Sequence, residues 1–300
     1  MTGALLTLVF FAVTAVFAGR SAVLLGPERA NLARLLVAVV LLGGGAHGLG
    51  SGLRGGASVG WFVASGVAGF GVGGLAMFQA LPRLGASLSM LIVQCGTVWV
   101  AAGIERVWLG TQLTAVQWGL AALTVLGVGI GLAPASWPRL ERGVWRSGVA
   151  WAFVSAFGQG LGAVISRKAY AVAHLAHAVP DPGTAAYQRV LGGITVAALA
   201  AGWVAWSGRV RPDTRPAVAT LRASWPWVAA NALTGPVLGV ACYQWALSST
   251  PAGIVQPVVA ASPLLTIPFA LWLEGRRPRG LYYAGALLAV AGVALLSLAK

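Results

Sequence analysis

The two halves of the chain resemble each other, and this internal repeat limits the folds that are open to it. Residues 76–132 and 241–298 show the same features in the same order. Each has an aromatic residue followed by Gln, a turn, an apolar run that ends in Glu and Arg, and a second apolar run rich in Gly. A duplicated apolar sequence of this kind is typical of membrane proteins in which two similar halves meet around a central site.

The earlier parts of the halves align less closely. Residues 13–23 lie over 154–164, and residues 31–40 lie over 186–195, which pairs Arg34 with Arg189. The repeat therefore covers most of the chain.

Composition indicates where such a chain folds. Hydrophobic residues make up 58% and charged residues 9% of the 300 residues, whereas about a quarter of a soluble domain is charged. The apolar runs have about the 20 residues that a helix needs to cross a bilayer. We therefore predict an all-α integral membrane protein with ten transmembrane helices, at about 4–25, 31–49, 58–81, 85–104, 113–133, 146–169, 184–206, 225–248, 252–273 and 280–299.

The boundary between the halves is predicted in the polar, Pro- and Arg-bearing stretch 134–143. It divides the chain into a first five-helix repeat, 1–138, and a second, 144–300. Because five is odd, the second repeat enters the membrane the other way up, so the prediction is two inverted repeats.

The net charge of +14 comes from Arg residues in short loops between apolar runs. This placement disfavours nucleic acid as a partner and indicates contacts with lipid headgroups. The loops after the odd-numbered spans hold most of these residues, so the positive-inside rule predicts that both termini face away from the cytoplasm.

Few residues could perform acid–base chemistry inside the membrane. The six acidic residues fall in loops or at span ends, which disfavours proton-coupled export of cationic drugs, because that reaction normally uses a carboxylate deep in the membrane. Membrane-enzyme and metal-binding motifs are not found, so we expect neither an enzyme nor a bound metal or cofactor. Glu105 and Glu274 stand at matching span ends, and each is interpreted as a structural clamp to loop amides or a nearby Arg.

Interrupted helices at matching places in two repeats are the best sequence indication of a binding site in a carrier. Proline removes a backbone donor and frees carbonyls. The candidate helix breaks are Gly96, Pro236, Pro257 and Pro263. Kinks that only shape the bundle are the alternative.

Polar and aromatic residues inside the spans are the candidate cavity lining, because an unpaired polar group in lipid is costly. They are Arg20, Gln79, Gln94, Trp99, Trp151, Gln159, Gln244, Trp245 and Gln256. Arg20 could clamp a carboxylate or phosphate. It could instead extend to the membrane interface.

The pattern resembles a known family. The Glu-bearing ends IER (104–106) and LEGR (273–276) and the Gly-rich runs QWGLAALTVLGVGI and YYAGALLAVAGVAL are similar to those of EamA-type members of the drug/metabolite transporter superfamily. The resemblance implies a ten-helix carrier of amino acids or other small metabolites. It also implies a central cavity formed mainly by the first, third and fourth helices and their repeat mates, and termini inside the cell, opposite to the charge bias. Arg20 departs from the small or amide residue often found near that position.

These observations favour a secondary transporter in the cytoplasmic membrane that moves a small organic solute, anionic ones included, by alternating access. A protein that flips or handles an anionic lipid headgroup is the alternative, and a scaffold without a polar cavity is a third possibility. Monomer and homodimer both stay open.

Overall fold

The computed structural model describes residues 1–134, 140–207, 218–266, 268 and 280–299. These residues form helices and no strand, which confirms the all-α prediction. The first repeat contains α1 (Thr2–Leu25), α2 (Pro27–Gly48), α3 (Ala57–Gly66), η1 (Val67–Val72), α4 (Gly73–Leu84), α5 (Ala86–Ile104), η2 (Glu105–Leu109) and α6 (Ala115–Leu132).

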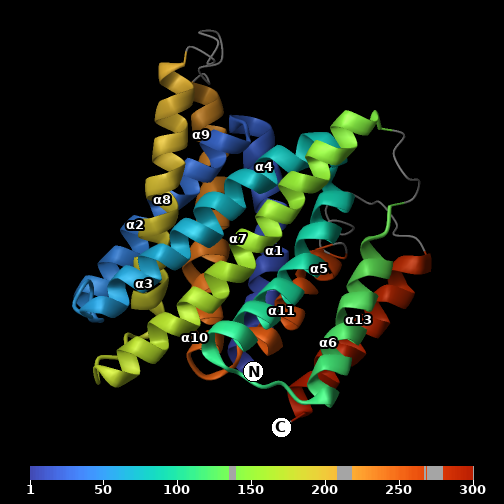
Figure 1. Ribbon diagram of the computed structural model, residues 1–300. Coiled ribbons are helices and arrows are strands. Elements are labelled where there is room, and N and C mark those ends of the chain that lie inside the picture. The colour runs from blue at the N-terminus through green and yellow to red at the C-terminus, as the bar shows by residue number, and fades with distance from the viewer. Residues whose placement is uncertain (135–139, 208–217, 267, 269–279, 300) are drawn as a thin grey trace.

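In its described residues the second repeat has the same order of helices as the first, apart from η2 (Figure 1). It contains α7 (Arg142–Leu175), α8 (Pro182–Trp206), α9 (Val218–Ala232), η4 (Leu233–Gly239), α10 (Val240–Ser249), α11 (Ala252–Ala260) and α13 (Gly280–Leu298). The exact bounds of the two repeats stay a prediction, because residues 135–139 at their junction lie outside the described part of the chain, as does Glu274.

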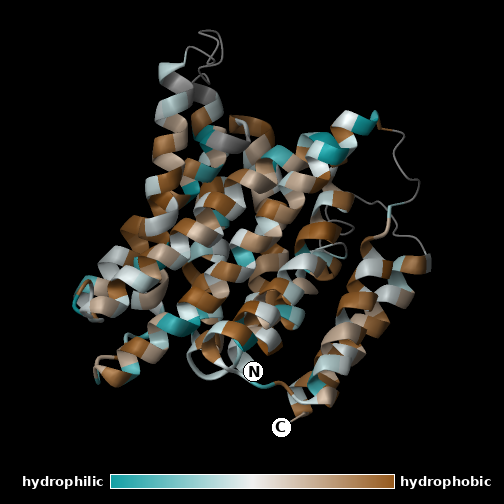
Figure 2. Ribbon diagram, viewed as in Figure 1, coloured by the Kyte–Doolittle hydropathy of each residue, from teal (hydrophilic) through white to brown (hydrophobic). Residues whose placement is uncertain are grey.

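Seven of the helices in the described residues are long and apolar enough to cross a membrane. The second repeat adds α8, the continuous α9–η4–α10 helix and the shorter apolar helix Ala252–Thr266, which gives five spans per repeat. Large apolar side chains such as Val40, Leu126 and Leu287 are exposed on the outside, where lipid would contact them. Figure 2 shows hydrophilic residues mainly near the helix ends.

The two repeats run in opposite directions, as predicted. Along the contact between α6 and α13, Thr124 faces Gly292 while Gly131 faces Gly285. Along the contact between α2 and α8, Gly43 faces Tyr187 while Gly50 faces Thr184. Residue numbers rise on one helix as they fall on the other, so both pairs of equivalent helices are antiparallel. Two antiparallel equivalent pairs require the second repeat to be inverted.

The first helix of each repeat packs against the third span of the other repeat. Helix α1 packs on α9, η4 and α10 of the second repeat, and its counterpart α7 packs on α3, η1 and α4 of the first. Small residues allow this closeness: a Cβ on Gly158 of α7 would lie 2.7 Å from the Ala68 carbonyl oxygen, and one on Gly162 would lie 2.9 Å from that of Ser65. Ser65 donates a 2.6 Å hydrogen bond to the Gly162 carbonyl across the same contact. Backbones that approach closely through small residues gain van der Waals contact in lipid.

Single glycines join consecutive helices in the first repeat. Gly26, with φ of 82°, separates α1 from α2, and Gly85, with φ of 79°, separates α4 from α5. Both lie in the left-handed region that favours glycine. The chain therefore reverses within one residue, which keeps successive spans side by side.

The third span of each repeat changes its helical geometry at the same place. A π-helical segment, η1 or η4, lies between two α-helical pieces in both. Pro236 falls inside η4. The other candidate breaks differ. Helix α5 passes through Gly96 without interruption, and α11 continues through Pro257. Helix α11 ends at Ala260, and a short helical stretch that contains Pro263 follows Ala261.

Candidate functional site

A cavity of about 320 Å³ lies between the repeats. Its lining comes from the first four spans of both halves, and α6 and α13 contribute none of it. The polar members are Thr14, Asn31, Arg34, Gln94, Thr97, Gln159, Arg189, Tyr243, Gln256 and Ser262. Aromatic and aliphatic side chains, among them Phe11, Phe70 and Phe78, supply much of the rest. An apolar cavity with a few converging polar groups is the usual form of a small-molecule site.

Four of the residues singled out in the sequence line this cavity. They are Gln94 of α5, Gln159 of α7, Pro236 of η4 and Gln256 of α11. Gln159 donates a 3.1 Å hydrogen bond to Ser155 Oγ, and Ser155 in turn donates to the Gly73 carbonyl at 2.8 Å. These bonds fix one cavity amide against the first repeat.

The other polar candidates lie elsewhere. Arg20 and Gln79 are exposed, and Gln79 accepts a 3.0 Å hydrogen bond from Arg83. Gln244 is buried in α10 but is not part of the lining, and neither end of its amide has a hydrogen-bond partner among the described residues.

The three tryptophan candidates, Trp99, Trp151 and Trp245, are each at least 39% exposed and lie outside the lining. Trp99 stacks on Trp118, with ring centroids 6.0 Å apart and planes at 3°. Gly96 meets α7, where an added Cβ would lie 3.0 Å from that of Ala156. Pro257 and Pro263 are buried and also fall outside the lining.

Arg34 is one of the two arginines in the cavity lining, neither of which the sequence placed among the candidates. It lies in the second turn of α2, is half-buried, and donates from Nε to Asn31 Oδ1 at 2.9 Å. Asn31 is one turn earlier on the same helix, so it orients the guanidinium while leaving its terminal nitrogens toward the cavity that both residues line.

Arg189 is the second. It lies in α8, is 5% exposed, and donates from Nη1 to Ser166 Oγ at 2.9 Å. Its Cζ lies 5.4 Å from the centre of the Phe70 ring and 5.3 Å from that of Tyr243. The two rings hold the cation by cation–π attraction, and the Nε has no hydrogen-bond partner among the described residues.

Each arginine contacts the π-helical segment of the opposite repeat. Arg189, from the second repeat, lies against Gly69 of η1, where an added Cβ would be 2.7 Å from Nη2. Arg34, from the first repeat, lies against Gly235 of η4, where an added Cβ would be 3.6 Å from Nη1. Gly69 and Gly235 are both the third residue of their π-helical segments. The repeat therefore supplies the cavity with two equivalent cross-repeat contacts.

A signal for these arginines is present in the sequence, because the alignment of the halves pairs them. However, both arginines stand near the polar ends of apolar runs, so they are counted with the charged residues of the loops. Both residues fall within the predicted spans 31–49 and 184–206, and the structure places them inside α2 and α8.

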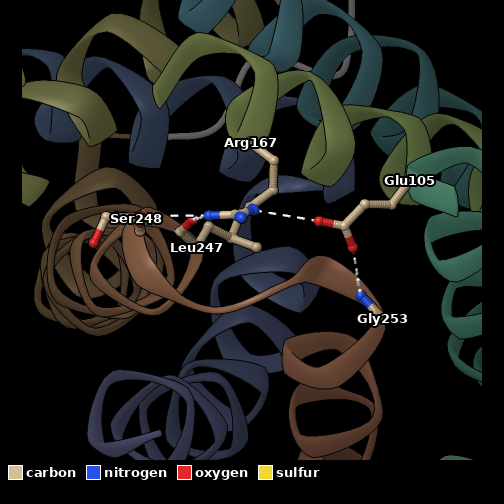
Figure 3. A network of polar contacts seen from close by, with 5 residues as sticks. All are labelled: Glu105, Arg167, Leu247, Ser248 and Gly253. Atoms are coloured by element: carbon tan, nitrogen blue, oxygen red, sulfur yellow. Dashed lines mark hydrogen bonds and ion pairs between the residues drawn. The ribbon is translucent and has the colours of Figure 1, made fainter. Parts of the chain in front are cut away.

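A second polar network lies at the end of the bundle where α10 and α11 meet (Figure 3). Glu105, 1% exposed, accepts from Arg167 Nε at 3.2 Å and from the Gly253 amide at 3.0 Å. Arg167 also donates from Nη1 to the Leu247 carbonyl at 2.7 Å. Glu105 thus ties α5, α7 and the start of α11 together, which is the kind of clamp to an amide and an Arg that its position predicts.

Comparison with known proteins agrees with this architecture. The model of the EamA-like transporter family matches residues 146–298, about half of the chain. The chain belongs to the EamA-like transporter family. It is therefore a multi-pass integral membrane protein and a membrane transporter.

One solved crystal structure that resembles this EamA-family chain covers 99% of it, and 96% of the solved chain is covered in turn, with a TM-score of 0.76 at 17% identity. At that identity the likeness concerns the fold alone, but it extends over both repeats. No curated protein matches the sequence significantly.

Proposed function

We propose that this transporter moves a small organic solute across the cytoplasmic membrane by alternating access, with the central cavity as the binding site. The observation that carries the proposal is the cavity itself, whose lining is shared between two inverted repeats. Its volume suits a small metabolite.

The π-helical segments support the same proposal. η1 and η4 both contribute to the lining, and π-helical segments inside longer helices are frequent at functional sites. A movement of one half against the other would open the opposite end of the cavity.

We further propose facilitated or exchange transport rather than proton antiport. No carboxylate lines the cavity among the described residues, and the buried Glu105 is engaged by Arg167 and the Gly253 amide. A proton carrier that competes with substrate would need an acidic group at the site.

The test is flux into proteoliposomes made with the purified protein. A thermal-shift screen of amino acids, dicarboxylates and sugar phosphates first selects a compound that stabilises the protein, because a ligand of the native state raises its melting point. That compound should enter liposomes, and a pH gradient should not be required. Flux that occurs only with a pH gradient would contradict the coupling proposal.

A matched pair of variants tests whether the cavity is the site. Gln94→Leu removes a lining amide, and Gln79→Leu removes an exposed one on the neighbouring span. We expect Gln94→Leu to lower flux about tenfold, the worth of one lost polar contact, and Gln79→Leu to leave it unchanged. Equal effects would exclude the cavity as the binding site.

A further inference from the structure

We propose that the transported solute carries two acidic groups, one bound by Arg34 and the other by Arg189. This inference rests on the proposed function, since it names the substrate class of the same cavity. Three observations support it: the unbalanced charge of the cavity, the separate places of the two guanidiniums, and the donors that each leaves unused.

The cavity is positively charged and lacks a counter-charge. Arg34 and Arg189 both line it, and no acidic side chain lines it among the described residues. Arginine stays protonated in proteins, and a buried charge is costly unless it is paired. The hydrogen bonds to Asn31 and Ser166 and the rings around Arg189 offset part of this cost. An anionic ligand would supply the missing counter-charge.

The two guanidiniums occupy different parts of the cavity. Arg34 lies against Gly235 and Arg189 lies against Tyr243, and both of these residues belong to the continuous η4–α10 helix. Eight residues, about two helical turns, separate them. One small acidic group cannot engage two cations at such different depths, whereas two groups joined by a linker can.

The apolar part of the lining suits an apolar linker. Leu35 and Val240 line the cavity and belong to one hydrophobic cluster, and Phe70, which contacts Arg189, packs against that cluster. A solute with an acidic group at each end and an apolar middle therefore matches the chemistry of the lining.

Each guanidinium has donors to spare. Arginine has five N–H donors in a fork that can bind an acidic group at two points. Nε of Arg34 donates to Asn31 and Nη1 of Arg189 donates to Ser166, and Arg189 also has a side-chain hydrogen bond with Tyr243. The Nε of Arg189 is buried without a partner in the described part of the chain, and an unmade hydrogen bond of this kind is a cost that a ligand can remove.

The experiment measures binding to the full-length protein in detergent by calorimetry. The probes are the dicarboxylates from succinate to suberate and the corresponding alkyl bisphosphonates, each beside its single-acid counterpart of equal length. We expect the best doubly acidic compound to bind at least about tenfold more tightly than its single-acid counterpart, since a hydrogen bond to a charged group contributes about that much.

The variants Arg34→Gln and Arg189→Gln should each remove this advantage while single-acid binding persists. Arg54→Gln, at an exposed loop position, is the matched control and should retain it. If a glutamine variant does not give a monodisperse helical protein, Arg34→Lys and Arg189→Lys keep the charge and should lower the advantage without removing it. The comparison of ligands on the unaltered protein decides the question in any case.

Equal affinity of double- and single-acid compounds for the unaltered protein would overturn the inference. If a neutral or zwitterionic solute then shows flux that depends on Gln94, the two-acid inference fails and the proposed function stands. If no soluble compound moves while phosphatidate vesicles bind the protein saturably, both fail, and a lipid headgroup is the ligand.

Discussion

At the scale of single residues, the most consequential positions are the glycines that meet the arginines. Gly69 and Gly235 contribute no side chain to the cavity, yet the lack of a Cβ lets the Arg189 guanidinium approach the backbone at Gly69 and the Thr14 hydroxyl approach it at Gly235, beside Arg34. The site therefore depends on residues that carry no chemistry of their own.

We predict that Gly69→Ala lowers transport about tenfold without lowering thermal stability. The new Cβ would lie 2.7 Å from Arg189 Nη2, the terminal nitrogen that is not bonded to Ser166, so this nitrogen must shift and a bound acidic group loses about one charged hydrogen bond. Alanine favours a helix more than glycine does. Liposome flux and the melting temperature are measured on the same preparation.

The control for this change is Gly103→Ala in α5, where an added Cβ has open space. It should leave both measurements close to those of the unaltered protein. Loss of transport in both variants, or a lower melting temperature in Gly69→Ala, would show that the effect is general to the fold.

Glu105 supports a second prediction at this scale. Glu105→Gln should destabilise the protein by about 1–3 kcal/mol, because Arg167 loses a charged partner in a buried network. Thermal unfolding in detergent measures the change. Glu141→Gln, at an exposed position before α7, is the control, and an equal shift in the two variants would disprove the clamp.

At the scale of elements, α6 and α13 differ from the other spans. They pack on each other along their length, at the edge of the bundle (Figure 1), and contribute nothing to the cavity lining. The Thr114 side chain accepts from the Gln117 amide and caps the start of α6. We interpret this pair as structural support for the eight spans that surround the cavity.

The glycines of this pair give a prediction. A Cβ on Gly127 would overlap the backbone of α13 at Gly285 and Ala289, so Gly127→Ala should lower stability by about 1–3 kcal/mol. Gly129→Ala, which faces open space on the same helix, should not. Thermal unfolding compares the two, and indistinguishable melting temperatures would contradict the tight contact.

At the scale of the whole molecule, the architecture could be predicted from the sequence because it depends on long-range patterns. Ten apolar runs and the matching halves determine the number of spans and their inversion. Hydropathy and repeat symmetry report these properties directly.

The site was harder to predict, because nearly continuous hydrophobicity hides which side of a span faces inward. Trp99, Trp151 and Trp245 point away from the cavity, whereas Gln94 and Gln159 face it. Helix rotation decides this, and contacts with other helices set the rotation. Arg34 and Arg189 fall inside the predicted spans 31–49 and 184–206, but as charged residues near span ends they are counted with the loop residues, so the sequence does not place them in the cavity.

Orientation in the membrane can be measured for the whole molecule. Both termini lie at the same end of the bundle, and α7 begins at the opposite end (Figure 1). From the distribution of Arg between the loops we predict that the termini face away from the cytoplasm. A phosphatase fused after Lys300 should be active and a fluorescent protein there should be dark. Fluorescence in the cytoplasm would reverse the assignment.

The cross-repeat contacts have a consequence for building hybrids from related carriers. Arg34 meets Gly235, and Arg189 meets Gly69, so an exchange of one half would place each cation beside a foreign backbone. Donor halves from relatives that lack these glycines should yield inactive chimaeras, even when the parents share a substrate. Among relatives we expect these four positions to change together.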